Sequence, residues 1–283
     1  MAIDLKKTFV LILKFTVMGI LIFFVIKKIN FPEFLLVLKR SNILLLVIAT
    51  TFFTLSKLVS SVRLNLFLGT IGVSLPEKYN MKLYWLGMYY NLFLPGGIGG
   101  DGYKVYLLNR EFKTGTKKIA SAILIDRVTG MMALFSLLVF LTYFVAFPTI
   151  FKYFIWVLIP ASVWIFYITI RNFFPDFLSV FHNTNLLSFG VQLSQLVAAF
   201  FILIALQQYS QLPEYLFVFL ISSVVAVIPF TIGGIGAREI TFLTGARLLH
   251  LDVQVSVAIS MIFFVISALV SLWGVRYSFS KIK

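Results

Sequence analysis

Long apolar runs, each near the length that crosses a bilayer as a helix, constrain the fold of this chain most strongly. A lipid-embedded helix satisfies its own backbone hydrogen bonds, so a run of about 20 apolar residues predicts a transmembrane helix. Only 12% of the 283 residues are charged, against about 25% in soluble domains, which excludes a soluble fold. Six uninterrupted runs predict full spans: 9–26, 43–62, 120–147, 151–170, 186–206 and 253–277.

Two further apolar segments, 83–108 and 216–243, contain Pro and clustered Gly near their middles. Both follow the pattern Pro-x-x-Ile-Gly-Gly-x-Gly-x-basic, and the two prolines are 134 positions apart. Such breaks are tolerated at membrane depth only beside protein or a wet cavity. We therefore predict two re-entrant hairpins, with broken motifs at 91–104 and 228–239. Their structural residues are Pro95, Gly96, Gly97, Gly99, Gly100, Pro229, Gly233, Gly234 and Gly236.

Three predicted spans separate the two motifs, so the second copy is expected to be inverted in the membrane relative to the first. Inverted repeats with interrupted helices are typical of transporters, whose binding site lies between the repeats. The alternative is that the glycines only permit close helix packing. The matched Pro, Ile, Gly and basic positions favour paired re-entrant elements in one membrane domain that covers residues 1–283.

The basic residues, which give the chain a net charge of +14, predict its orientation. With both hairpins re-entrant and the N-terminus cytoplasmic, 14 Lys and Arg lie inside and seven lie outside. This bias agrees with the positive-inside rule, although four bases in the first loop (Lys27, Lys28, Lys39 and Arg40) favour the opposite orientation. We predict a multi-pass protein with both termini in the cytoplasm.

Ionisable residues in the apolar segments are candidates for function, because a charge at the bilayer centre costs about 3 kcal/mol and needs a partner or a wet path. Asp101 follows the first Gly cluster, where it could bind a cationic or hydroxylated headgroup or cap the next helix. Asp126 and Arg127 are neighbours on a helix and point in different directions, so each is expected to pair elsewhere. Arg127 is expected to pair with Asp101 or Glu239, for substrate passage or as a structural interhelical pair.

Other polar residues have further interpretations. Arg238 and Glu239 close the second motif and are candidate headgroup ligands, with a snorkelling Arg and a local cap or pair as the alternative. Lys57 and Arg63 are expected to snorkel to phosphates at the membrane surface. Gln192 is expected to form a hydrogen bond between helices.

Several function classes are disfavoured by what the sequence lacks. The chain has no cysteine, which excludes disulfides, thiolate metal sites and cysteine nucleophiles. It contains no HExxH, GxSxG or Walker motif, so no enzymatic activity, metal or cofactor is predicted. Lys and Arg fill short loops instead of forming a separate basic arm, which argues against nucleic acid as a partner.

Three motifs together resemble the flippase-like membrane region of the lysylphosphatidylglycerol synthase family: Asn91-x-x-x-Pro95-Gly96-Gly97-x-Gly99-Gly100-Asp101, Asp126-Arg127-x-x-Gly130 and Pro229-x-x-x-Gly233-Gly234-x-Gly236-x-Arg238-Glu239. The resemblance implies an inner-membrane protein with paired broken helices. In members fused to an aminoacyl-transferase domain it implies movement of an aminoacylated phospholipid between leaflets. It marks Asp101, Arg127 and Glu239 as the charged positions of greatest importance. The sequence ends at Lys283 without such a domain, so lipid synthesis is not expected.

The combined hypothesis is a lipid translocase that holds headgroups in a polar groove between the hairpins while acyl chains stay in lipid. Its expected headgroup ligands are Asn91, Asp101, Asp126, Arg127, Arg238 and Glu239. The alternative is a non-transporting scaffold for a membrane glycosyltransferase or a lipid-synthesis enzyme. Membrane lipids with charged headgroups are the expected partners, and assembly with a second copy is left open.

Overall fold

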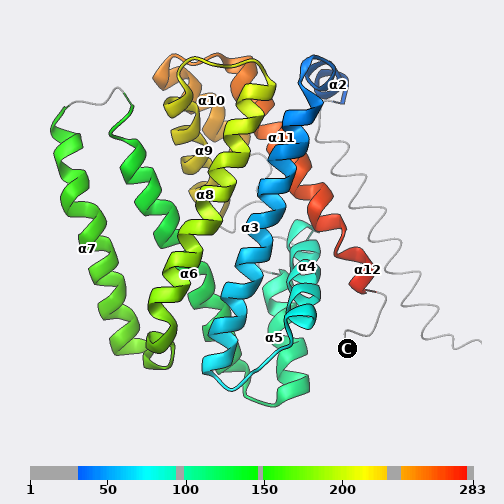
Figure 1. Cartoon of the computed structure of the whole chain (residues 1–283), viewed down its shortest axis with the longest axis vertical. Helices are drawn as coiled ribbons and strands as arrows, with labels where there is room; N and C mark the ends of the chain where they lie inside the picture. Colours follow the sequence, from blue (N-terminus) through cyan, green and yellow to red (C-terminus); the bar gives the residue numbers. More distant parts are fainter. Residues whose placement is uncertain (1–30, 94–98, 146–148, 228–236, 279–283) are drawn as a thin grey trace, which may run out of the picture. The chain divides into compact units, whose positions relative to one another are not determined.

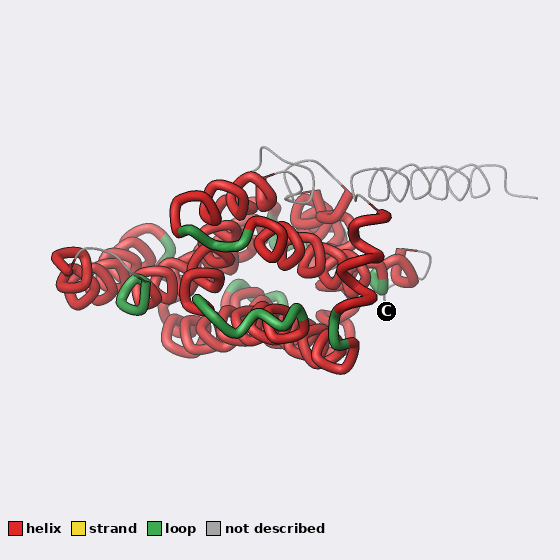
Figure 2. The backbone as a smooth tube through the Cα atoms, turned by 90° about the horizontal axis from the view of Figure 1, so that it is seen from above, coloured by secondary structure: helices red, strands yellow, loops and turns green. Residues whose placement is uncertain are grey.

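The computed structural model describes residues 31–93, 99–145, 149–227 and 237–278. Within these ranges every regular element is a helix, and the helices are joined by loops (Figure 2). The predicted all-helical polytopic membrane fold is therefore confirmed. The predicted span 9–26 lies outside the described residues, as do Pro95, Gly96, Gly97, Pro229, Gly233, Gly234 and Gly236.

The chain divides into two compact units, Met1–Ser41 and Asn42–Lys283. The described part of the first unit is helix α2 (Phe31–Arg40). The second unit holds the helices that concern the site (Figure 1). These are α3 (Ile43–Thr70), α4 (Glu77–Phe93), α5 (Gly99–Phe112), α6 (Thr116–Leu141), α7 (Thr149–Phe173), the 3₁₀ helix η1 (Pro175–Val180), α8 (Phe181–Ala205), α9 (Leu212–Val227), α10 (Ala237–Leu249), α11 (Val253–Leu272) and α12 (Val275–Ser278).

Much of the apolar surface of the long helices faces outward. In the described ranges, four helical stretches are long and apolar enough to cross a membrane: Ile43–Thr70, Thr116–Leu141, Pro175–Ala205 and Val253–Ser278. Their most apolar windows are only between 22% and 56% buried inside the protein, which leaves apolar side chains for lipid to cover. The predicted span 151–170 falls within α7.

Helices α3 and α8 run antiparallel and form the most extensive contact between described helices (Figure 1). At one end, Asn42 caps α3 by accepting a hydrogen bond from the Leu44 N–H at 3.0 Å, while its own N–H donates to the Ala205 carbonyl at 3.1 Å. Further along, the rings of Phe52 and Phe201 stack with centroids 5.8 Å apart. The pair is a long support along which the other helices are arranged.

The first predicted hairpin is a pair of helices, α4 and α5, that flank residues 94–98 and pack against each other. Their contact is very close at Gly100, because a Cβ atom there would lie 1.9 Å from the Gly87 carbonyl oxygen. The Gly100 N–H also donates to Asn91 Oδ1 at 2.7 Å, which fixes the start of α5 against the end of α4. The motif residues Asn91 and Gly100 thus hold the two arms together.

The second predicted hairpin is formed by α9 and α10, which flank residues 228–236 and also pack together. In Figure 1 this pair lies toward the upper end of α8, and the α4–α5 pair lies toward the lower end of α3, which runs antiparallel to α8. Opposite placement is what an inverted repeat would produce. The depth of the hairpins in a membrane and the symmetry of the repeat remain predictions.

A hydrophobic cluster fixes the end of α3 that is near the first hairpin. Leu64 and Phe67 of α3, Leu83 of α4, Ile119 of α6 and Phe177 of η1 are all buried within it. The rings of Phe67 and Phe177 meet edge to face, with centroids 5.7 Å apart. This packing makes α3, α4 and α6 a rigid support for the charged side chains that they present to one another.

Candidate functional site

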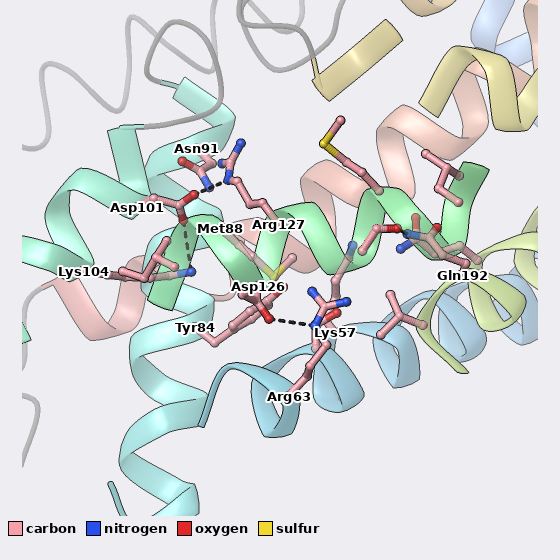
Figure 3. A pocket seen from close by; sticks show the side chains of 17 residues that line it. Lys57, Arg63, Tyr84, Met88, Asn91, Asp101, Lys104, Asp126, Arg127 and Gln192 are labelled. Atoms are coloured by element: carbon pink, nitrogen blue, oxygen red, sulfur yellow. Dashed lines mark hydrogen bonds and ion pairs between the residues drawn. The ribbon is translucent and has the colours of Figure 1, made fainter. Parts of the chain in front are cut away.

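A polar cavity of about 270 Å³ lies between α3, α4, α5, α6 and α8 (Figure 3). Its wall carries six ionisable side chains: Lys57, Arg63, Asp101, Lys104, Asp126 and Arg127. The other polar side chains of the wall are Ser60, Tyr84, Asn91, Gln192 and Gln195. Such a concentration of charge between apolar helices is costly unless partners or water are present, so the contacts within the cavity decide what it can do.

Asp101 joins two bases at one end of the cavity. Its carboxylate accepts a hydrogen bond from Lys104 Nζ at 3.2 Å and another from Arg127 Nε. The Arg127–Asp101 pair is one of the two partnerships predicted from the sequence. Helix α5 begins at Gly99, so Asp101 lies inside its first turn and does not cap it. The Arg127 side chain is 29% exposed and that of Asp101 only 10%, which places Arg127 nearer to the surface.

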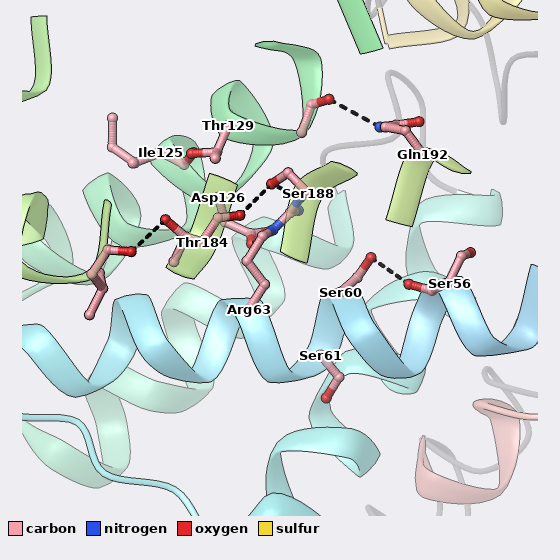
Figure 4. A network of polar contacts seen from close by, with 12 residues as sticks. Ser56, Ser60, Ser61, Arg63, Ile125, Asp126, Thr129, Thr184, Ser188 and Gln192 are labelled. Carbon is pink, nitrogen blue, oxygen red and sulfur yellow. Dashed lines mark hydrogen bonds and ion pairs between the residues drawn. The ribbon is translucent and has the colours of Figure 1, made fainter. Parts of the chain in front are cut away.

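Asp126 points away from Arg127, as neighbouring helical positions require, and pairs with Arg63 of α3. The Arg63 Nε donates to Asp126 Oδ1 at 2.7 Å, and the Arg63 Nη1 donates to the Ser188 hydroxyl at 2.7 Å (Figure 4). The Ser188 hydroxyl donates in turn to the Thr184 carbonyl at 2.8 Å. Both charged residues are buried, and their network connects α3, α6 and α8.

The expectation that Arg63 snorkels to the membrane surface is therefore wrong. Its side chain is 6% exposed and turns into the protein, because Asp126 offers it a carboxylate there. Lys57, which was given the same interpretation, lines the cavity instead. For Arg63, a partner distant in the sequence thus decides the direction of the side chain.

Lys57 differs from the other bases of the cavity. Its ammonium lies 4.5 Å from the centroid of the Phe53 ring, a cation–π contact one helical turn away. Among the described residues it has no ion pair and no hydrogen bond. Segments 94–98 and 228–236 contain no Asp or Glu, so neither can supply a carboxylate to it. Lys57 is consequently a cation whose charge no acid of the described site balances.

Two glycines leave space for the side chains of Lys104 and Arg63. A Cβ atom at Gly87 would lie 2.2 Å from Lys104 Cε, and one at Gly130 would lie 3.2 Å from Arg63 Nη1. The Gly130 carbonyl also accepts a hydrogen bond at 3.0 Å from Gln192 Nε2, an interhelical bond of the kind predicted for that residue. The motif Asp126-Arg127-x-x-Gly130 is thereby explained: its acid holds Arg63, its base holds Asp101, and its glycine leaves space for Arg63.

Replacing Gly87 by Ala is expected to displace Lys104 from Asp101 and from the Tyr84 ring, whose centroid lies 4.5 Å from the Lys104 ammonium. Loss of a hydrogen bond to a charged group costs about 1.5–3 kcal/mol, and the helical preference of Ala over Gly returns about 1 kcal/mol. The free energy of unfolding, measured by titration of mixed micelles with a denaturing detergent, should therefore fall by about 0.5–2 kcal/mol.

The same substitution in a Lys104→Ala background is the control. With no Lys104 side chain to displace, Gly87→Ala should be neutral or slightly stabilising. Equal losses in both backgrounds would contradict the account, because they would show that the new methyl group disturbs something other than Lys104.

Arg238 and Glu239 do not line this cavity. Both lie in the first turn of α10, and the Arg238 guanidinium packs against Phe263 of α11 and Phe219 of α9, at 5.1 Å and 6.0 Å from the ring centroids. The predicted set of six ligands is therefore divided. Asn91, Asp101, Asp126 and Arg127 come together in the cavity, and Arg238 and Glu239 lie at the other hairpin.

The candidate ligands predicted from the sequence did not include several polar residues of the cavity, among them Lys57, Arg63, Tyr84 and Lys104. A signal for three of them was present in the sequence. Lys57, Ser60 and Arg63 recur at a spacing of three, which places them along one face of α3. Lys104 follows Asp101 by three positions, a spacing that lets the two side chains meet.

Comparison with known proteins agrees with the three motifs. Residues 11–274, most of the chain, match the family described as the lysylphosphatidylglycerol synthase TM region. No curated protein and no solved structure shows significant similarity to the chain. The matched range contains every residue of the cavity and both hairpins. The chain belongs to the family of the lysylphosphatidylglycerol synthase transmembrane region, a membrane domain linked to lipid modification and flippase-like function.

Proposed function

We propose that the protein is a lipid translocase that moves a phospholipid or another lipid-linked amphiphile between leaflets. The headgroup enters the polar cavity while the acyl chains remain in the bilayer. The protein itself carries out no covalent chemistry. Both termini are proposed to lie on the cytoplasmic side of the inner membrane, as the distribution of Lys and Arg favours.

The observation that carries this proposal is the convergence of six ionisable side chains from α3, α5 and α6 on one cavity of about 270 Å³. Here four bases meet two acids around open space. An open, charged cavity between lipid-facing helices is suited to a headgroup.

The size and edge of the cavity fit a headgroup better than a whole lipid. Its volume is below the 300–1,000 Å³ that is usual for drug-sized ligands, so long acyl chains have no room in it. Met131 of α6 lines the cavity and is nevertheless 40% exposed. An apolar, exposed side chain at the rim is where an acyl chain would leave the cavity for the bilayer.

Blocking the cavity after folding should stop lipid exchange. The chain has no cysteine, so Gln195→Cys, in the cavity wall on α8, would introduce a single thiol. The purified variant is labelled with a bulky maleimide in detergent and reconstituted into liposomes that contain fluorescent phospholipids. Exchange between leaflets should fall at least about tenfold, the effect of about 1.4 kcal/mol, because the label occupies the space of the headgroup.

The matched control is Leu193→Cys on the same helix, whose side chain is 47% exposed. Labelled to the same extent, it should exchange lipid like the unmodified protein. Equal exchange by both labelled variants would contradict the assignment of the cavity. If the wild-type protein is incorporated into the liposomes but exchanges no class of lipid between leaflets, the result would contradict translocation itself and favour the scaffold hypothesis.

A further inference from the structure

We infer that the cavity selects an anionic, phosphate-bearing headgroup, and that Lys57 is the base that binds it. This inference rests on the proposed function and specifies its substrate class. It depends on the balance of charge in the cavity and on the one base whose charge no described acid neutralises.

The balance of charge follows from the contacts. The wall holds the four bases Lys57, Arg63, Lys104 and Arg127 and the two acids Asp101 and Asp126. Asp126 is matched by Arg63, whereas Asp101 is shared by Lys104 and Arg127. The described wall thus holds two more bases than acids, and by this count the cavity carries a net charge of about +2.

The surroundings of Lys57 strengthen the positive potential. Arg63, a second base of the cavity wall, lies less than two turns further along the same helix. Phe53 packs under the ammonium, and its ring meets Phe263 at 5.3 Å, which in turn packs against the Arg238 guanidinium at 5.1 Å. Aromatic faces stabilise these cations partly but supply no anion. A bound anion would complete the site.

Phosphate is the anion that fits this arrangement. A phosphate ester presents several acceptor oxygens to donors on different sides, and Lys57, Arg127 and Lys104 surround the space from α3, α6 and α5. The amide groups of Gln192 and Gln195 and the Ser60 hydroxyl offer polar contacts to the rest of a headgroup. A headgroup with a compensating ammonium would bring a positive charge into a cavity that already has an excess of it, so zwitterionic lipids should bind less well.

Direct binding tests the inference. Purified protein in neutral detergent is titrated with short-chain phosphatidic acid, short-chain phosphatidylcholine and inorganic phosphate, with a thermal shift or thermophoresis as the readout. Phosphatidic acid should bind at least about tenfold more tightly than phosphatidylcholine, and Lys57→Gln should remove at least about tenfold of that affinity, as the loss of a charged hydrogen bond predicts. Lys57→Arg, which keeps the charge, should retain most of the affinity.

The control variant is Lys117→Gln, which makes the same charge change at an exposed position in the first turn of α6 and should bind like the wild type. If inorganic phosphate binds as tightly as phosphatidic acid, the site recognises phosphate, and a soluble phosphate is identified as its ligand. If phosphatidic acid binds far more tightly than inorganic phosphate, the ligand is identified as a lipid. Equal affinity for the two lipids, or an unchanged preference in Lys57→Gln with the fold intact, would overturn the inference.

Failure of this inference and failure of the proposed function give different results. If the label on Gln195→Cys blocks lipid exchange but the protein shows no preference for anionic lipid, the translocase function would stand and only the phosphate selectivity would be overturned. If anionic lipid binds through Lys57 but no lipid is exchanged between leaflets, the selectivity for anionic headgroups would stand and the translocase function would be overturned.

Discussion

Replacing Asp126 by Leu is expected to lower the free energy of unfolding by about 3–5 kcal/mol, because it leaves the buried Arg63 guanidinium without its carboxylate. The Arg63 side chain is only 6% exposed, and its hydrogen bond to the neutral Ser188 hydroxyl cannot balance its charge. The measurement is the unfolding midpoint and slope in mixed micelles titrated with a denaturing detergent, followed by far-ultraviolet circular dichroism.

The double variant Arg63→Met with Asp126→Leu tests the reason for the loss. Removing both charges leaves no unpaired ion, so it should recover most of the stability lost in the single variant. Asp176→Asn, at an exposed position in η1, should change stability by no more than about 0.5 kcal/mol. A double variant as unstable as Asp126→Leu would show that the charge of Arg63 is not the cause.

Local helix geometry made half of the charged network predictable. Asp126 and Arg127 are adjacent, so a helix must direct them to different neighbours, and the expected Arg127–Asp101 pair is present. The partner of Asp126 was not predictable in this way. Arg63 lies 63 residues earlier in the chain and on another helix, and taken alone its position near the end of an apolar run is typical of a snorkelling base.

The repeated Pro-Gly motifs predicted where helix pairs would form but not which residues they would bring together. Both breaks are flanked by packed helix pairs, as expected. Arg238, however, packs between aromatic rings of α9 and α11, and it does not join Asp101 and Arg127 in the cavity wall. A repeat in the sequence defines equivalent positions, whereas the distance between the two copies depends on the packing of the helices between them.

The role of Gly87 was also beyond sequence reasoning. It is a single glycine within α4 and belongs to neither motif, yet it is the residue against which Gly100 packs. Such a contact becomes visible only when the two helices are placed side by side. Once they are, Gly87 accounts for both the approach of α5 and the path of the Lys104 side chain.

Replacing Gly100 by Val is expected to separate α5 from α4 and to destabilise the protein by about 3 kcal/mol or more, the upper end of overpacking effects. A Cβ atom at this position would lie 1.9 Å from the Gly87 carbonyl oxygen and 2.7 Å from its carbonyl carbon. Both are backbone atoms of a helix, so no side-chain rotation relieves the clash. The unfolding free energy in mixed micelles and the rate of trypsin cleavage after Lys104 would both report the separation.

Gly102 is the matched control, two residues further along the same helix. A Cβ atom there meets nothing within 4 Å, so Gly102→Ala should stabilise the protein by about 0.5–1 kcal/mol through helical preference alone. A loss of stability in Gly100→Val together with a gain in Gly102→Ala would assign the close approach of the two helices to Gly100 specifically. Equal losses at both positions would instead mean that α5 tolerates no side chain on either face, and that the Gly100–Gly87 contact is not what holds the first hairpin together.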